Sequence, residues 1–119
     1  VFGDRLYIYG SHDRFDGRKF CENDYVCWSA PVTDLADWRY EGVIYHRTQD
    51  PRMPHGEHEL WAPDVVQGKD GRYYLYYCPD DKVKSIGVAV CDTLPLPATS
   101  CATRSATGPT AGSAMAAWW

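Results

Sequence analysis

Hydrophobic and polar positions alternate along most of this chain with the two-residue period of a β-strand, and no segment shows the period of a helix. The strand-like runs are short, rich in aromatic and β-branched side chains, and bounded by glycine, proline or polar clusters. Two long polar stretches, residues 11–23 and 46–59, interrupt them. The pattern predicts an all-β protein with strands over residues 5–10, 24–32, 38–45, 62–67, 72–78 and 85–92.

The strand pattern repeats within the chain. The segment "DRLYIY" (residues 4–9) is echoed by "GRYYLY" (71–76), and "YVCWSAPVTDL" (25–35) is echoed more loosely by "IGVAVCDTL" (86–94). The two pairs keep the same order and lie about sixty residues apart, so the repeating unit is a sheet of about four strands. In residues 72–78 both alternating sets of side chains are apolar or aromatic, which predicts that both faces of the sheet are covered. Repeated small sheets of this kind predict a β-propeller.

The charge balance argues against two classes of partner. The 119 residues include 12 Lys and Arg and 16 Asp and Glu, for a net charge of -4. This composition has no basic patch for nucleic acid and no polybasic segment for a membrane surface. No run of about 18 apolar residues is present to span a bilayer. We therefore expect neither nucleic acid nor membrane as a partner.

The cysteine spacing predicts reduced thiols. There are five cysteines, an odd number, without a CxxC pair, so neither a disulfide framework nor a zinc knuckle is expected. Unpaired thiols slightly favour the cytoplasm. The chain begins at Val1 rather than Met, so the presence of a signal peptide stays undecided. The histidines of the second polar stretch lack the spacing of metal ligands, and we expect no metal site or cofactor.

The last part of the chain has a different composition. Residues 94–119 are dominated by Ala, Ser, Thr, Gly and Pro, contain no acidic residue and show no strand alternation. We divide the chain into residues 1–93, which carry the strands, and residues 94–119, an irregular tail. Two explanations of the tail stay open: a flexible terminal segment, or an artefact of reading frame or assembly.

Four segments together resemble the N-terminal part of glycoside hydrolase family 43. They are "RLYIYGSHD", "DYVCWSAPVTDLADWRYEG", "LWAPDVVQGKDGRYYLYY" and "IGVAVCDT", and the resemblance runs from Val1 to about Thr93. The most specific element is the WAPD segment followed by the "DGRYYLYY" hairpin. The resemblance implies a five-bladed β-propeller, of which this chain contains about one and a half to two blades. The family includes β-xylosidases, α-L-arabinofuranosidases and arabinanases.

The resemblance also implies hydrolysis with inversion by two carboxyl groups, with a third carboxylate tuning the acid. In the family, the base precedes the first strand, which places it upstream of Val1 here. The modulating aspartate and the acid belong to later blades, downstream of this chain. Residues 1–119 should therefore contain no catalytic carboxylate and should be inactive alone. A structural calcium ion in the full-length propeller is compatible with the resemblance.

What the resemblance carries over to this chain is the lining of a sugar pocket. Trp61 matches the family's glycone-site tryptophan, and Asp64, His12 and Asp13 are candidate polar contacts to sugar hydroxyls. We expect these residues to lie together at one end of the two sheets. Each has a structural alternative: Trp61 could pack between sheets, Asp64 could cap a turn, and His12 and Asp13 could be a solvated loop pair.

These observations predict a fragment of a glycosidase acting on pentose-containing plant polysaccharides or oligosaccharides. The alternatives are a carbohydrate-binding propeller without chemistry and an inactive truncated product. The residues do not distinguish xylosidase from arabinofuranosidase or arabinanase, nor exo from endo action.

Overall fold

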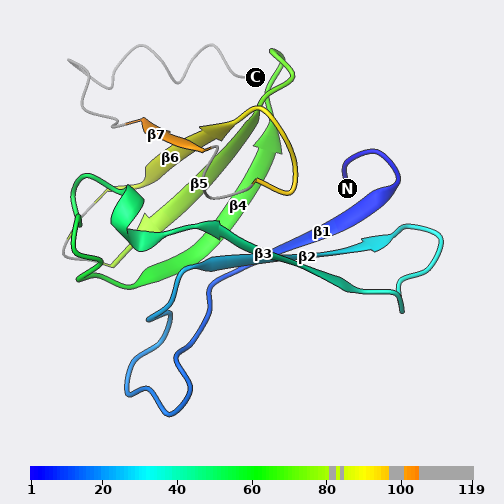
Figure 1. The fold of residues 1–119 in the computed structure, drawn as a ribbon. Helices are drawn as coiled ribbons and strands as arrows, with labels where there is room; N and C mark the ends of the chain where they lie inside the picture. The colour runs from blue at the N-terminus through cyan, green and yellow to red at the C-terminus, as the bar shows by residue number, and fades with distance from the viewer. Residues whose placement is uncertain (81–82, 84, 97–100, 105–119) are drawn as a thin grey trace.

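The computed structural model describes residues 1–80, 83, 85–96 and 101–104, with the backbone alone at 104. Its strands form two antiparallel sheets joined by a long connection that includes one short 3-10 helix, η1 (Arg47–Gln49), and the described residues contain no α-helix (Figure 1). The first sheet has the order β1-β2-β3 and the second the order β4-β5-β6-β7. The strands are β1 (Arg5–Gly10), β2 (Tyr25–Pro31), β3 (Arg39–Tyr45), β4 (Leu60–Gln67), β5 (Tyr73–Pro79), β6 (Gly87–Cys91) and β7 (Ala102–Arg104).

The sequence repeat corresponds to a repeat in the order of the strands. The segment at 4–9 contains β1 and the segment at 71–76 contains β5, and each is followed by two further antiparallel strands. By this order β1-β2-β3 correspond to β5-β6-β7, and β4 is the additional strand of the second sheet. All six predicted strands are present, but β4 begins two residues earlier than expected.

Residues 101–104 differ from the sequence prediction. Residues 102–104 were expected to be irregular, yet they form β7, which pairs antiparallel with β6. Cys101 forms a disulfide with Cys91, and the two Cα atoms are 4.5 Å apart. The prediction of reduced thiols is therefore wrong for this pair, and the argument for a reducing compartment is lost with it. The remaining tail, residues 97–100 and 105–119, lies outside the described residues.

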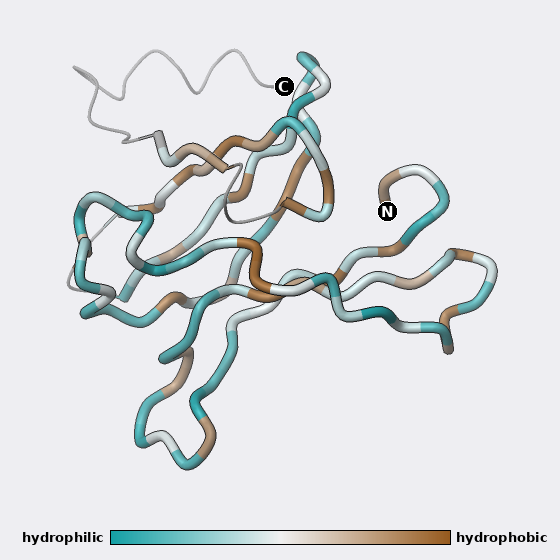
Figure 2. The backbone as a smooth tube through the Cα atoms, in the orientation of Figure 1, coloured by the Kyte–Doolittle hydropathy of each residue, from teal (hydrophilic) through white to brown (hydrophobic). Residues whose placement is uncertain are grey.

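The core lies between the two sheets and is dominated by aromatic side chains. Tyr25 and Tyr45 come from the first sheet and Tyr77 from the second, and the Tyr45 and Tyr77 ring centroids are 4.6 Å apart. Figure 2 shows hydrophobic positions along the strands of the second sheet and at the end of β3, whereas the loops are mostly hydrophilic. Burial of these large side chains supplies the main driving force for packing one sheet on the other.

A buried polar network crosses the same interface. The Tyr45 hydroxyl donates to the Tyr77 hydroxyl at 2.8 Å, and the Tyr77 hydroxyl donates to Asp50 Oδ2 at 2.8 Å. The Arg52 guanidinium pairs with the same carboxylate at 2.5 Å. Burial alone would raise the pKa of Asp50, but the hydrogen bonds from Arg52 and Tyr77 outweigh it and lower the pKa below its usual value. Asp50 is thus a buried, ionised and fully paired carboxylate.

Each sheet also has a face that packs against no other sheet among the described residues. A cross-strand row of exposed apolar side chains, Ile8, Trp28 and Tyr40, runs over the first sheet, and Val66 and Tyr76 lie exposed on the second. The coverage predicted for both faces of residues 72–78 is that of stacked blades, and within the described residues one of the two faces of β5 is open. Large exposed side chains of this kind normally mark surfaces that another layer covers.

Replacement of Asp50 by Asn should destabilise the chain by about 3 kcal/mol at neutral pH, because it leaves the Arg52 guanidinium partly buried without its counter-charge. Asp70→Asn is the matched control. Like Asp50, Asp70 contacts an arginine two residues ahead and a tyrosine hydroxyl, here those of Arg72 and Tyr74, but it lies in an exposed turn. Denaturant unfolding measures the difference, which should be clearly smaller for Asp70→Asn.

The destabilisation caused by Asp50→Asn should depend on pH. Because the native pKa of Asp50 is lowered, its contribution is complete above about pH 4 and is lost as the pH falls through the native pKa. The gap between wild type and Asp50→Asn should therefore narrow in acid. A gap that stays constant down to pH 2 would contradict an ionised Asp50.

Candidate functional site

The loop between β1 and β2, residues 11–24, is closed by its own hydrogen bonds. Asp13 Oδ1 accepts from the backbone N–H of Cys21 at 2.7 Å, and the Asn23 side chain donates to the Asp13 carbonyl at 2.9 Å. The Asn23 N–H donates to the His12 carbonyl at 2.9 Å. Cys21 has a φ of 56°, in the left-handed region that non-glycine residues rarely adopt. The Asp13 carboxylate therefore stabilises an otherwise unfavourable turn.

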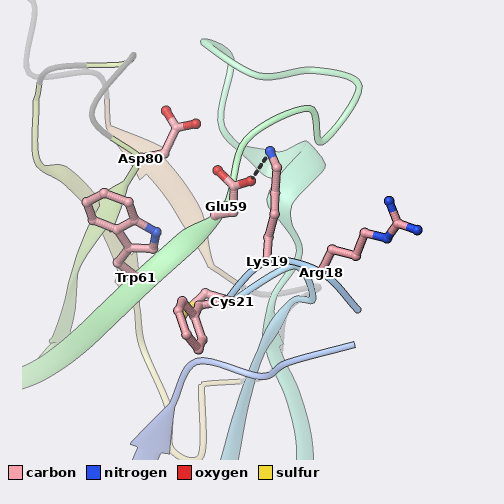
Figure 3. A pocket seen from close by; sticks show the side chains of 7 residues that line it. Arg18, Lys19, Cys21, Glu59, Trp61 and Asp80 are labelled. Carbon is pink, nitrogen blue, oxygen red and sulfur yellow. Dashed lines mark hydrogen bonds and ion pairs between the residues drawn. The ribbon is translucent and has the colours of Figure 1, made fainter. Parts of the chain in front are cut away.

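The same loop is fastened to the start of β4. The Leu60 N–H donates to the Cys21 carbonyl at 3.1 Å, and Lys19 Nζ contacts Glu59 Oε1 at 2.6 Å (Figure 3). The hydrogen bond and charge of Glu59 raise the pKa of Lys19. These contacts join residues that lie forty positions apart in the sequence, so they bring the first sheet's loop against the second sheet.

An open pocket of about 620 Å³ lies where the loop meets β4. Trp61 is 41% exposed there, and Phe20 on the loop is 79% exposed. Figure 3 shows Lys19 extending from the loop to Glu59, while the Arg18 side chain extends away from Trp61. The pocket thus combines two accessible aromatic rings with carboxylates and a cation. Its lining consists of Arg18, Lys19, Phe20, Cys21, Glu59, Trp61 and Asp80.

A β-bulge sets the direction of Trp61. Leu60 and Val65 are both buried, although they are five residues apart and an uninterrupted strand would place them on opposite faces. The pairing shifts register between Trp61, opposite Cys78, and Asp64, opposite Tyr76. Pro63 lies inside this irregularity, where the missing N–H of a proline costs no ladder hydrogen bond. The extra residue allows Leu60 to fill the core while Trp61 faces outward.

A buried aspartate supports the other side of the pocket. Asp80 is 4% exposed, its Oδ2 lies 3.0 Å from His58 Nδ1, and its backbone N–H donates to the Glu59 carbonyl at 3.1 Å. These bonds hold Asp80, which follows β5, beside Glu59, which precedes β4. Glu59 is therefore positioned by its backbone through Asp80 and by its side chain through Lys19.

The structure gives different surroundings to the four residues that the sequence suggested for sugar contact. Trp61 lines the pocket. Asp64 instead lines a second hollow of about 640 Å³ on the exposed face of the second sheet, and its Oδ1 accepts from the Val65 N–H at 2.9 Å. His12 is exposed and does not line the pocket, and Asp13 serves the loop. Trp61 and Asp64 nevertheless lie on the same face of β4, because their partners Cys78 and Tyr76 are two residues apart on β5. The shared site therefore stays a prediction for Asp64, and the β1–β2 loop reaches Trp61 through residues 18–21.

Four lining residues, Lys19, Phe20, Glu59 and Asp80, were not among the candidates suggested by the sequence. Glu59 adjoins the WAPD segment and could have been included on that ground, whereas Lys19 carries no local signal. Within the described part of the chain, no group of three or more His, Cys, Asp or Glu side chains is placed to hold a metal ion. No helix among the same residues is long and apolar enough to cross a membrane.

Asp13→Ala should loosen the loop, whereas Asp13→Asn should retain it, because an amide oxygen can still accept the hydrogen bond from Cys21. Limited trypsin digestion after Arg14, Arg18 and Lys19 measures the opening. The net loss of one such exposed hydrogen bond, about 0.5–1.5 kcal/mol, should speed cleavage of the Ala variant by roughly 2- to 10-fold. Equal cleavage of both variants would show that Asp13 does not hold the turn.

Most of this chain is similar in sequence to known proteins. Residues 1–97 match the model of glycosyl hydrolases family 43. A xylosidase/arabinosidase of Thermoclostridium stercorarium is 68% identical over 93 residues, which are 78% of this chain and 20% of the relative. Xylosidase/arabinosidase 43A of Humicola insolens is 39% identical over 105 residues, 77% of this chain and 30% of the relative.

A solved structure is similar in fold to most of this chain. The structure of RS223-β-xylosidase superimposes with a TM-score of 0.66 at 28% identity, over 87% of this chain and 33% of that one. The chain thus spans about a fifth to a third of the relatives it matches. The comparison confirms the all-β fold and the partial propeller expected from the sequence. Because the family model covers most of its length, the chain belongs to glycosyl hydrolase family 43.

Proposed function

We propose that this chain is part of a glycosidase that cleaves pentose-containing polysaccharides or oligosaccharides with inversion, and that it forms one wall of the sugar-binding pocket. The observation that carries the proposal is the pocket where the β1–β2 loop meets β4, with Trp61 and Phe20 exposed beside Glu59. The names of the relatives, xylosidase/arabinosidase in both cases, support the substrate class.

The chemistry of the pocket suits a sugar. A pyranose or furanose ring presents C–H groups on its faces, which pack on aromatic rings, and hydroxyl groups around its edge. A carboxylate accepts hydrogen bonds from such hydroxyls and has two oxygens for the purpose. Glu59 Oε1 is held by Lys19, which fixes the orientation of the carboxylate before a sugar arrives. Glu59 and Trp61 are therefore assigned to binding.

In this proposal, the catalytic acid and base lie outside the pocket. Inversion uses an acid and a base about 6.5–9.5 Å apart, on opposite sides of the anomeric carbon. The family resemblance assigns the base to a position upstream of Val1 and the other two carboxylates to positions downstream. Asp13 is engaged with the Cys21 N–H, and Asp64 faces a different hollow, so neither is assigned a catalytic role.

Trp61→Ala should weaken binding of xylobiose or arabinobiose by about 3- to 10-fold, the loss of one aromatic contact. Trp28→Ala is the matched control, because Trp28 is 43% exposed but lies on the first sheet, outside the pocket lining. Titration followed by NMR chemical shifts measures both affinities. Equal weakening by the two substitutions, or none by Trp61→Ala, would exclude this pocket as the sugar site.

Residues 1–119 should release no product from aryl xylosides or aryl arabinofuranosides above background, because the proposal places acid and base elsewhere. Chromogenic release over hours measures this. Turnover that disappears in Glu59→Gln or Asp80→Asn would instead make a carboxylate of the pocket catalytic and overturn its assignment to binding.

A further inference from the structure

The fourth strand of the second sheet comes from outside the part of the chain that resembles the family. The family match ends at residue 97, whereas β7 comprises Ala102–Arg104 and begins directly after Cys101. The strand is joined to the sheet in two ways: by three residue pairs with β6, and by the disulfide from Cys101 to Cys91, the last residue of β6.

β7 also reaches the first sheet. Thr103 Oγ1 lies 2.9 Å from the Tyr45 hydroxyl and donates to the Gln49 carbonyl at 3.0 Å. The Gln49 side chain donates in turn to the Cys101 carbonyl at 3.2 Å. Tyr45 belongs to the buried network that crosses between the sheets through Tyr77. A strand of three residues therefore covers one end of the contact on which the packing of the two sheets depends.

So short an edge strand is weakly held by its backbone alone. Three paired residues at a sheet edge belong to the least stable part of a fold, where local opening is frequent. The disulfide closes a loop of ten residues and limits how far β7 can move when its hydrogen bonds break. The position of β7 thus depends on the bonds that Thr103 and Gln49 make and on one covalent bond that a reductant can cleave.

We propose that the Cys91–Cys101 disulfide is a redox-sensitive latch: a dithiol reductant opens it, releases β7 from β6 and uncovers the Tyr45 end of the network between the sheets. A thiolate of the reductant attacks Cys101 when β7 opens locally, and a mixed disulfide forms as Cys91 leaves as a thiolate and takes up a proton. The second thiol of the reductant then displaces Cys101. Two protein thiols form, and the reductant is oxidised to its own disulfide.

Two of the three free cysteines, Cys27 and Cys21, are poorly placed to interfere. Cys27 is buried in the core, and burial raises the pKa of its thiol to about 12, which leaves almost no thiolate to attack the latch. Cys21 lies in the pocket on the β1–β2 loop and accepts the Leu60 N–H with its backbone. Reduction should therefore act at β7 and leave the pocket contacts in place.

The test uses the full chain purified without reductant and denatured in the presence of an alkylating agent. Mass spectrometry should show three alkylated cysteines, and five after treatment with dithiothreitol. A peptide linking Cys91 to Cys101 should appear only in the untreated sample. Five alkylated cysteines without reductant would overturn the proposal at once, whether or not the chain binds sugar.

Hydrogen exchange then tests the release. After reduction, those amides of residues 88–90 and 102–104 that point into the β6–β7 ladder should exchange at least about tenfold faster, and Cys101→Ser should show the same rates without reductant. Cys78→Ser is the control and should keep the slow rates. Thr103→Val should speed exchange of the oxidised chain while the disulfide remains. Unchanged protection in reduced wild type would refute the latch, because β7 would then be held without it.

Discussion

Two tyrosines on different sheets share a hydrogen bond, and one of them, Tyr77, donates in turn to the buried Asp50 carboxylate; the placement of the two sheets follows from that contact. Tyr45 ends β3 and Tyr77 lies near the end of β5, so their contact fixes where the first sheet crosses the second. Asp50 can remain charged in this position only because Arg52 and Tyr77 together satisfy its oxygens. The aromatic packing supplies the affinity between the sheets, and the polar network selects one arrangement of them.

The backbone near this contact is shaped to admit it. Gly87 lies opposite Tyr77 in the ladder, and a Cβ at this position would come within 2.0 Å of the Tyr77 ring. The ring therefore lies over a residue without a side chain, where it can reach both Tyr45 and Asp50. The connection that carries Asp50 continues to Glu59 and β4, so the network that joins the sheets also determines where the wall of the pocket begins.

The sequence allowed the strands to be predicted because a half-buried strand requires alternation, and the echo between β1 and β5 allowed the two sheets to be predicted. β7 was missed because Ala102–Arg104 does not alternate and is held by a disulfide and by Thr103, both of which depend on the fold. Trp61 could be placed in a pocket from its motif. Its neighbour Lys19 could not, because a lysine in a polar loop has no pattern that reveals a partner forty residues away. Trp61 and Asp64 lie on the same face of β4 but line different hollows, which residue spacing does not reveal.

The bulge in β4 makes the length of that segment more important than most of its side chains. Leu60 and Trp61 are adjacent, one in the core and one in the pocket, and the extra residue before Asp64 decides which is which. Deletion of Ala62 would restore a regular ladder with β5 and would exchange the two faces, so that an indole would have to fit the space of a leucine. We therefore expect natural variation in β4 to take the form of substitutions. Insertions and deletions should be confined to its flanking loops, since a change of one residue would alter the core and the pocket beside Trp61 together.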